Sequence, residues 1–161
     1  MEINLYHIID EKKDILFYVS QLCNRLFQNK SPAIIIAENK DMCIEIDKKL
    51  WSLNVEEFVP HDIYNKDIDY KEQDIILISD ELMVNSPNEH YNLIIPDKFN
   101  DDLLGLLVKE LNAISILYKK MYLFTKSKNL KLIDKLIEER FNVEINKYLQ
   151  NIVNGSWDKI K

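Results

Sequence analysis

The residue types that most often catalyse reactions or bind metals are few in this sequence, and they do not form known motifs. The three histidines, His7, His61 and His90, show neither HExxH nor HxxxH spacing. The two cysteines, Cys23 and Cys43, form no CxxC pair and fall in patterns typical of apolar helix faces. Such spacings are what bring metal ligands together on one helix or one turn. We therefore expect no metal site and interpret both cysteines as buried, reduced thiols.

Phosphate binding and acid/base catalysis have no better support. A nucleotide-binding loop needs glycines at the first strand-to-helix turn, which here reads HIIDEKKD. The two glycines, Gly105 and Gly155, lie far from that turn and belong to no GxGxxG or GxxxxGK motif. Neighbouring acids such as Asp10 and Glu11 are interpreted as solvated charge. We expect no cofactor and no catalytic residues.

The charge balance argues against direct binding to nucleic acid. Lysine and arginine total 21 residues against 27 aspartates and glutamates, which gives a formal net charge of -6. A polyanion would therefore meet net repulsion unless the cations cluster. The N-terminal residues lack a basic segment followed by an apolar run, and no stretch approaches the roughly 18 apolar residues of a membrane span. We expect a cytoplasmic protein that contacts neither nucleic acid nor membranes directly.

The first fifty residues alternate between strand and helix patterns. Residues 3–9 are rich in β-branched and aromatic residues and predict a strand, and residues 11–29 follow with apolar residues at helical spacing. Residues 33–37 are too short for a helix and apolar throughout, which is typical of a central strand. Asn39 predicts the N-cap of a second helix, whose inward positions include Leu50.

The middle of the chain continues the strand pattern. We expect short strands at 57–61, 74–80 and 91–97, with a polar surface loop at 62–73. Strands and helices in alternation predict an α/β fold, with a Rossmann-like, mostly parallel sheet flanked by helices on both sides.

Two helical regions are predicted in the rest of the chain. One runs from about Asp101 through Tyr122, and the other covers residues 127–153 and forms a helical C-terminal extension. The extension carries an apolar stripe that would be exposed unless it packs on the domain. The stripe consists of Leu130, Ile133, Leu136, Ile137 and Phe141.

Two large aromatic residues stand out because neither is needed to end a helix or make a turn. Trp51 lies beside the buried stripe of the second predicted helix, and Phe58 begins the strand that follows. Aromatic residues dominate the energetics of protein interfaces, so the two would suit a partner-binding face. The alternative is that both are ordinary core residues.

The pair LW at 50–51, followed after residues 52–57 by FVPH at 58–61, resembles the chi subunit of bacterial DNA polymerase III, an accessory protein of the clamp-loader complex. The wider order of segments agrees, from NLYHIID through DIILISD and YNLIIPD to a tyrosine-lysine pair. The resemblance covers roughly residues 1–122 and is most specific at 50–61. It implies a nucleotide-free α/β domain at 1–122, without catalysis of its own. We expect residues 123–161 to be a helical extension packed on the same domain.

The resemblance also implies two partner sites. In that family the tryptophan and the phenylalanine of FVPH lie on the face that binds the psi subunit, which tethers chi to the clamp loader. Trp51 and Phe58 match these positions, and Pro60 and His61 complete the motif.

The second implied site binds the acidic, phenylalanine-terminated tail of single-stranded DNA-binding protein. Tyr118 and Lys119 match a tyrosine-lysine pair of the family, on a late helix. The family's arginine and an earlier lysine align with Ser115 and Leu111, so the site is carried over only in part. The residues expected to form it are Tyr118, Lys119, Lys120 and Lys109.

Two alternatives stay open at this point. The chain could be a small α/β enzyme with an unrecognised site, which a nucleotide-induced thermal shift would reveal. It could also be a similar adaptor whose aromatic face holds a helicase-like partner instead of psi.

Overall fold

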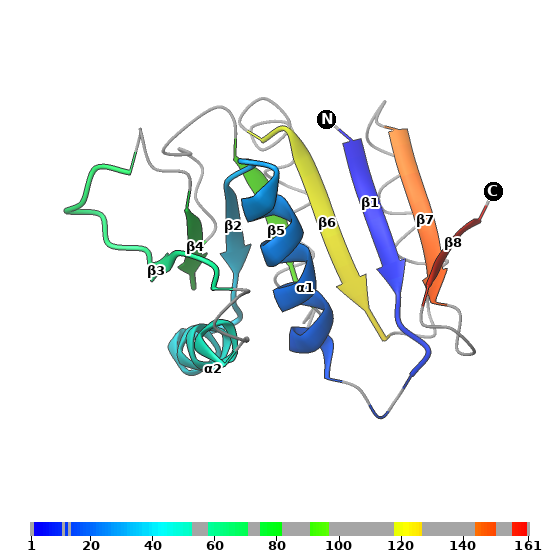
Figure 1. The fold of residues 1–161 in the computed structure, drawn as a ribbon, viewed down its shortest axis with the longest axis horizontal. Coiled ribbons are helices and arrows are strands. Elements are labelled where there is room, and N and C mark those ends of the chain that lie inside the picture. Colours follow the sequence, from blue (N-terminus) through cyan, green and yellow to red (C-terminus); the bar gives the residue numbers. More distant parts are fainter. Residues whose placement is uncertain are drawn as a thin grey trace.

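In the part of the chain that the structure describes, the alternating strand and helix patterns fold into one eight-stranded sheet with two helices on one of its faces (Figure 1). The structure is a computed structural model and describes residues 2–10, 12, 14–52, 58–70, 75–81, 91–96, 118–126, 144–150 and 156–160. The strands are β1 (Glu2–His7), β2 (Ala33–Ile36), β3 (His61–Ile63), β4 (Ile76–Ser79), β5 (Asn92–Ile95), β6 (Lys120–Thr125), β7 (Glu144–Gln150) and β8 (Trp157–Ile160). The helices are α1 (Ile15–Gln28) and α2 (Lys40–Trp51).

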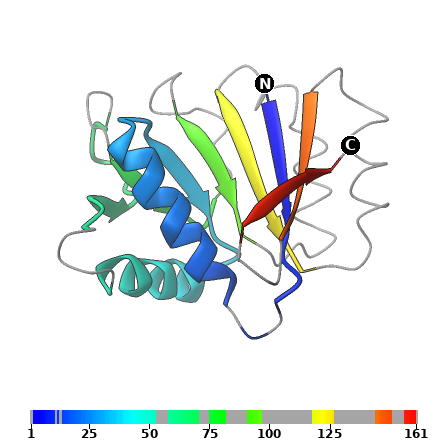
Figure 2. The same cartoon turned by 45° about the vertical axis from the view of Figure 1, so that its right-hand side comes forward.

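The strands run in the order β3-β4-β2-β5-β6-β1-β7-β8. All neighbouring pairs are parallel except β7 and β8, which are antiparallel. Figure 2 shows β8 crossing in front of β7 at one end of the sheet, whereas β3 lies at the other end beside α2. The predicted α/β class, with a mostly parallel Rossmann-like sheet, is therefore confirmed.

Both helices begin at side chains that cap their first turns. The carboxylate of Asp14 accepts a hydrogen bond from the backbone N–H of Leu16, and the side chain of Asn39 accepts one from the N–H of Met42 at 2.9 Å. Asparagine and aspartate are favoured there because they satisfy N–H groups that have no partner within the helix. The predicted N-cap at Asn39 is confirmed, and it sets where α2 begins.

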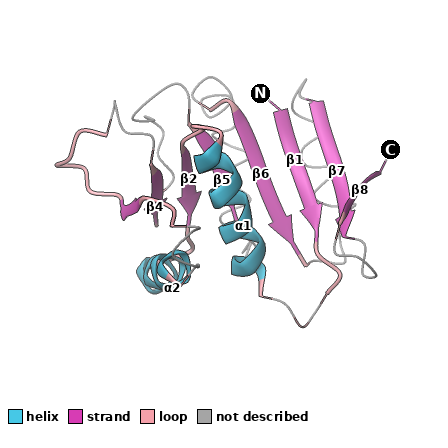
Figure 3. Ribbon diagram, in the orientation of Figure 1, coloured by secondary structure: helices cyan, strands magenta, loops and turns pink. Residues whose placement is uncertain are grey.

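The core has two layers, one on each face of the sheet. Under α1 and α2, buried residues from both helices pack on alternate residues of the central strands, such as Ile35 and Ile78. The opposite face buries the intervening residues, including Ile34 and Leu77. Successive residues of a strand point to opposite faces, so a strand covered on both sides is apolar throughout, as β2 is. Figure 3 shows α1 and α2 on the same side of the strands.

The two cysteines belong to the layer under the helices. Cys23 and Cys43 are buried, free thiols, as predicted. Burial raises the pKa of both thiols, and that of Cys43 reaches about 11, because the thiolate would lose its hydration. Among the helices that the structure describes, none is long and apolar enough to cross a membrane.

The strand predicted at 57–61 is shifted along the chain. Residues 58–60 are irregular, and β3 begins only at His61. Pro60 lacks an N–H for a sheet ladder, but its carbonyl accepts a hydrogen bond from the N–H of Ile76 at 3.0 Å. The predicted surface loop at 62–73 is also wrong in part, because it includes two residues of β3 and the buried Tyr70.

The helix predicted from Asp101 to Tyr122 is wrong at its C-terminal end. Residues 120–125 form β6, which lies between β5 and β1. Met121 and Phe124 are buried on opposite faces of the sheet. A run buried on both faces carries no strand-like alternation, so its periodicity does not distinguish it from a helix. Residues 101–117 lie outside the described part of the chain.

The predicted helical extension is wrong where the structure describes it. Residues 144–150 form β7, which pairs with β1, and residues 157–160 form β8. Ile145, Tyr148 and Leu149 have the spacing of a helix face. Pairing with β1 nevertheless gives the backbone N–H and C=O groups their hydrogen-bond partners and places Ile145 against the core. The apolar stripe from Leu130 to Phe141 lies outside the described residues.

Candidate functional site

Trp51 and Phe58 form an exposed pair of aromatic rings, here called the aromatic pair, at the C-terminal end of α2. Their ring centroids lie 5.2 Å apart, and the ring planes are tilted by 40°. Trp51 is 60% exposed and Phe58 is 46% exposed. Ile44, which is 44% exposed, lies two turns before Trp51 on the same side of α2. These three residues give this end of the sheet an apolar surface.

The position of Trp51 follows from the helical repeat of α2. Cys43, Ile46 and Leu50 are the buried residues of this helix. Trp51 comes one residue after Leu50, a rotation of about 100° that takes it off the buried stripe. Large apolar side chains that are exposed next to one another often mark a site of protein interaction. The alternative that both aromatic residues are ordinary core residues does not fit their exposure.

His61 lies beneath the aromatic pair. Its ring centroid is 5.1 Å from that of Trp51 in an edge-on arrangement, and 6.5 Å from that of Phe58. The side chain of His61 is fully buried. The sequence predicts His61 as part of the partner surface; in the structure its side chain lies under the two aromatic rings and is not exposed.

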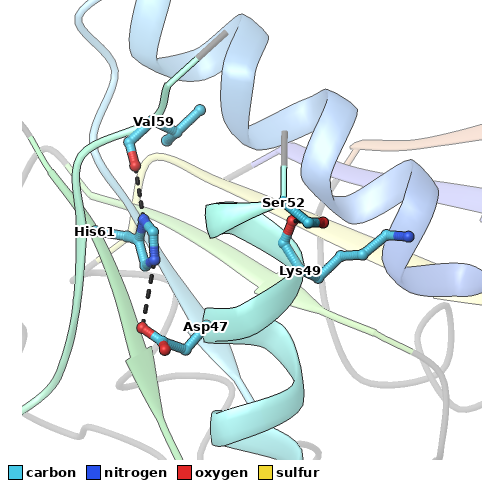
Figure 4. Close-up of polar contacts among 5 residues, drawn as sticks. All are labelled: Asp47, Lys49, Ser52, Val59 and His61. Carbon is cyan, nitrogen blue, oxygen red and sulfur yellow. Dashed lines mark hydrogen bonds and ion pairs between the residues drawn. The ribbon is translucent and has the colours of Figure 1, made fainter. Parts of the chain in front are cut away.

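Both ring nitrogens of His61 face oxygen atoms (Figure 4). Nδ1 lies 2.6 Å from the backbone carbonyl oxygen of Val59, and Nε2 lies 3.3 Å from Oδ1 of Asp47. The second contact is close enough for an ion pair, but its direction does not meet that of a hydrogen bond. Asp47 comes from α2, so the contact joins the helix to the segment that carries Phe58.

Asp47 is the residue of this site that sequence reasoning missed. It precedes Trp51 by one helical turn and therefore lies on the same side of α2. A spacing of one turn is only a weak indication of a role in the site, because a solvated aspartate on the surface of a helix can have the same spacing. Two further residues hold the 58–61 segment in place. Val59 is buried, and the carbonyl of Pro60 accepts the hydrogen bond from Ile76 that attaches the segment to β4.

The second predicted site has a different character. Tyr118 is only 3% exposed and belongs to the core opposite α1, where burial raises the pKa of its hydroxyl group. Lys119 is exposed, and Lys120 begins β6 with its Nζ 2.8 Å from Oε2 of Glu2. The three residues are thus adjacent, but Tyr118 and Lys119 precede the strand β6 and Lys120 begins it, so these residues are not part of the predicted helix. Lys109 lies outside the described residues, as do Ser115 and Leu111.

Aromatic residues also gather where α1 meets β1, β6, β7 and β8, an arrangement that sequence reasoning missed. Tyr6 stacks on Phe124 and on Tyr148, with ring centroids 5.1 and 4.9 Å away, and Trp157 meets Tyr6 edge-on. Tyr6, Tyr18, Gln21, Leu22, Arg25, Phe124 and Trp157 line a pocket of about 40 Å³. Small-molecule sites usually measure about 300–1,000 Å³, so this pocket is too small for a substrate.

The chemistry available at the aromatic pair is that of binding rather than of reaction. Both nitrogens of His61 are engaged by oxygen atoms in the protein interior, so this ring presents no base to an outside substrate. Within the described ranges, no three His, Cys, Asp or Glu side chains cluster as metal ligands would. An apolar surface over a fixed, buried support suits a protein partner.

Comparison with known proteins agrees with the resemblance of the LW and FVPH segments. No curated protein matches the chain. The family described as DNA polymerase III chi subunit, HolC, matches residues 1–115, which is more than half of the chain and includes both members of the aromatic pair. The chain therefore belongs to the DNA polymerase III chi subunit family and is an accessory subunit of that polymerase.

Proposed function

We propose that the protein is a non-catalytic adaptor that links the clamp-loader complex, through the psi subunit, to single-stranded DNA-binding protein during DNA replication. The observation that carries this proposal is the exposed aromatic pair at the end of α2. Membership of the chi subunit family supports the assignment to the polymerase, and the aromatic pair supplies the surface by which the chain would attach.

The energetics of the pair favour a partner that covers it. Complete burial of a large aromatic side chain contributes about 1.5–3 kcal/mol relative to leaving it exposed. Tryptophan is among the residues most enriched at the energetic centres of interfaces, and it is most effective when neighbouring contacts exclude water. Trp51 and Phe58, with Ile44 beside them, offer such a centre. We infer that psi inserts apolar side chains against these residues.

The proposed second contact, with the acidic tail of single-stranded DNA-binding protein, rests on the cations near the start of β6. Lys119 is exposed, whereas Lys120 already pairs with Glu2. Tyr118 is buried, so its ring would support an apolar pocket from below and would itself offer little surface to the tail. Fewer cations are offered to the tail than the family pattern has, so we expect weak binding.

A reconstitution experiment tests the adaptor proposal. The chain is mixed with purified psi and with single-stranded DNA-binding protein, alone and together, and complexes are separated by size exclusion. We expect a ternary complex that forms only when the chain is present. Failure of the chain to bind psi, together with thermal stabilisation by a nucleotide, would favour the enzyme alternative. Binding to a helicase but not to psi would keep the adaptor and change the partner.

A further inference from the structure

The buried ring of His61 contacts an oxygen atom at each of its two nitrogens. Its side chain is fully buried, and each of its two ring nitrogens faces an oxygen, one from the backbone of Val59 and one from the carboxylate of Asp47. The two oxygens come from different elements, since Asp47 belongs to α2 and Val59 to the segment before β3. The ring therefore bridges the two pieces of chain that carry Trp51 and Phe58.

A neutral imidazole satisfies only one of these two contacts. It has one N–H donor and one lone pair, so either tautomer turns a lone pair toward an oxygen. With the proton on Nδ1, the lone pair of Nε2 faces Asp47 at 3.3 Å; with the proton on Nε2, the lone pair of Nδ1 faces the carbonyl of Val59 at 2.6 Å. A buried polar atom without its hydrogen bond is costly. The imidazolium donates a hydrogen bond to the carbonyl of Val59 and places its positive charge beside the carboxylate of Asp47.

Asp47 is the charged group that faces the ring among the neighbours that the structure describes. From α2, Asp47 supplies a negative charge, whereas Lys49 points away from His61 in Figure 4. Ile76 of β4 pairs with His61 and is apolar. On β3 itself, the neighbouring Asp62 accepts a hydrogen bond from the hydroxyl of Tyr70 at 3.2 Å. The ring of Trp51 meets that of His61 edge-on, with ring centroids 5.1 Å apart.

We infer that His61 is a positioning residue that, in its doubly protonated form, clamps Asp47 to the Val59 carbonyl and so holds Trp51 and Phe58 at the spacing a partner meets. Loss of the proton removes one of the two contacts and loosens the 58–61 segment from α2. The aromatic pair is then less ordered, and the docking surface weaker. The clamp thus holds while the ring keeps both protons and is lost when one of them leaves.

The consequence for partner binding rests on the proposed function, whereas the charge on His61 does not. The first test therefore uses the chain alone. Two-bond proton–nitrogen NMR spectra distinguish an imidazolium from either neutral tautomer, and His61→Gln assigns the His61 signals among the three histidines. We expect both nitrogens of His61 to carry protons at about pH 6.

A variant pair shows whether Asp47 is responsible. Asp47→Asn removes the charge that faces Nε2, and Glu45→Gln removes an exposed charge from the same helix as a matched control. Asp47→Asn should shift the His61 signals toward the neutral ring at about pH 6, and Glu45→Gln should leave them unchanged. A neutral His61 in the wild type at about pH 6, or an unchanged spectrum in a folded Asp47→Asn variant, would overturn the inference; the wild-type spectrum needs no variant to fold.

The second test measures psi binding at about pH 6 and about pH 8, with the wild type and His61→Gln. We expect the wild type to bind about fivefold more tightly at the lower pH and His61→Gln to show no such difference, since one ion pair is at stake. Equal pH dependence in both proteins would contradict the clamp. Absence of psi binding at either pH would instead count against the proposed function, and the NMR result would still decide the charge on His61.

Discussion

Leu50 and Trp51 are consecutive residues of α2 with opposite environments. Leu50 is 1% exposed and packs in the core under the helices, whereas Trp51 is 60% exposed and packs on Phe58. One step along the helix separates a residue that stabilises the fold from a residue that is available to a partner.

This contrast predicts different effects on stability. Leu50→Ala should lower the free energy of unfolding by about 2–5 kcal/mol, because it leaves a cavity in a packed core. Trp51→Ala should lower it by less than about 1 kcal/mol, because the indole is mostly exposed. Urea denaturation followed by circular dichroism measures both. If Trp51→Ala destabilised the protein as much as Leu50→Ala, Trp51 would be a core residue and the proposed surface would be wrong.

The Glu2–Lys120 ion pair joins β1 to β6 and predicts a small pH-dependent contribution. The hydrogen bond from Lys120 lowers the pKa of Glu2, and the same bond raises the pKa of Lys120. The contribution of Glu2 to the free energy of unfolding is therefore complete above the ordinary pKa of glutamate and is lost as pH falls through the lowered pKa. The contribution of Lys120 to the free energy of unfolding is complete below the ordinary pKa of lysine and is lost as pH rises through the raised pKa.

Glu2→Gln measures this pair and keeps the oxygen that accepts the hydrogen bond of Asn146. Both charged side chains are about one-third exposed, so we expect a loss of less than about 1 kcal/mol at neutral pH, which shrinks further at high salt. Glu45→Gln on the outer side of α2 is the control. A loss that stayed the same in molar salt would show that the effect is not electrostatic.

The C-terminal segment is predicted to be protected from solvent exchange. Residues 144–149 of β7 pair with β1, and Tyr148 stacks on Tyr6. Backbone N–H groups held in a sheet exchange slowly because exchange requires local opening. Amide hydrogen exchange with mass spectrometry should show slow exchange for residues 144–150, and we extend the expectation to residues 127–152 because of their apolar stripe. Rapid exchange throughout this range would contradict it.

The tail of single-stranded DNA-binding protein is predicted to bind weakly and through Lys119. A labelled acidic peptide ending in phenylalanine is titrated against the wild type and Lys119→Ala at low and moderate salt. Lys66→Ala, which removes another exposed lysine, is the control. We expect saturable binding that Lys119→Ala weakens, with a modest salt dependence because few cations take part. Binding that is indifferent to Lys119, or absent at low salt, would remove the tail site from this protein.

The N-terminal half of the fold was predictable because its signals are local. Asn39 caps α2, residues 33–37 form an apolar central strand, and the stripe of α2 ends at Leu50. The second half was predicted less well because its strands depend on distant partners. The spacing of Ile145, Tyr148 and Leu149 suits a helix, and only pairing with β1, more than 130 residues away in sequence, makes β7 a strand.

The candidate site was predictable in the same uneven way. The types and spacing of Trp51 and Phe58 identified them as candidates, but their exposure depends on how α2 packs against the sheet. The role of Asp47 was not predictable, because nothing local relates it to His61 until the 58–61 segment returns alongside α2. For Tyr118, a helical pattern suggested a surface that the strand β6 does not provide.

The affinity of the chain for psi, measured by isothermal titration calorimetry with the wild type, Trp51→Ala and Phe58→Ala, tests the adaptor proposal most directly. Ile160→Ala, which removes another exposed apolar side chain from the far edge of the sheet, is the matched control. We predict that each aromatic substitution costs about 2 kcal/mol or more of binding free energy, roughly thirtyfold in Kd, while the control binds as the wild type does. Unchanged affinity in folded Trp51→Ala and Phe58→Ala proteins would contradict the account, because psi would then dock elsewhere.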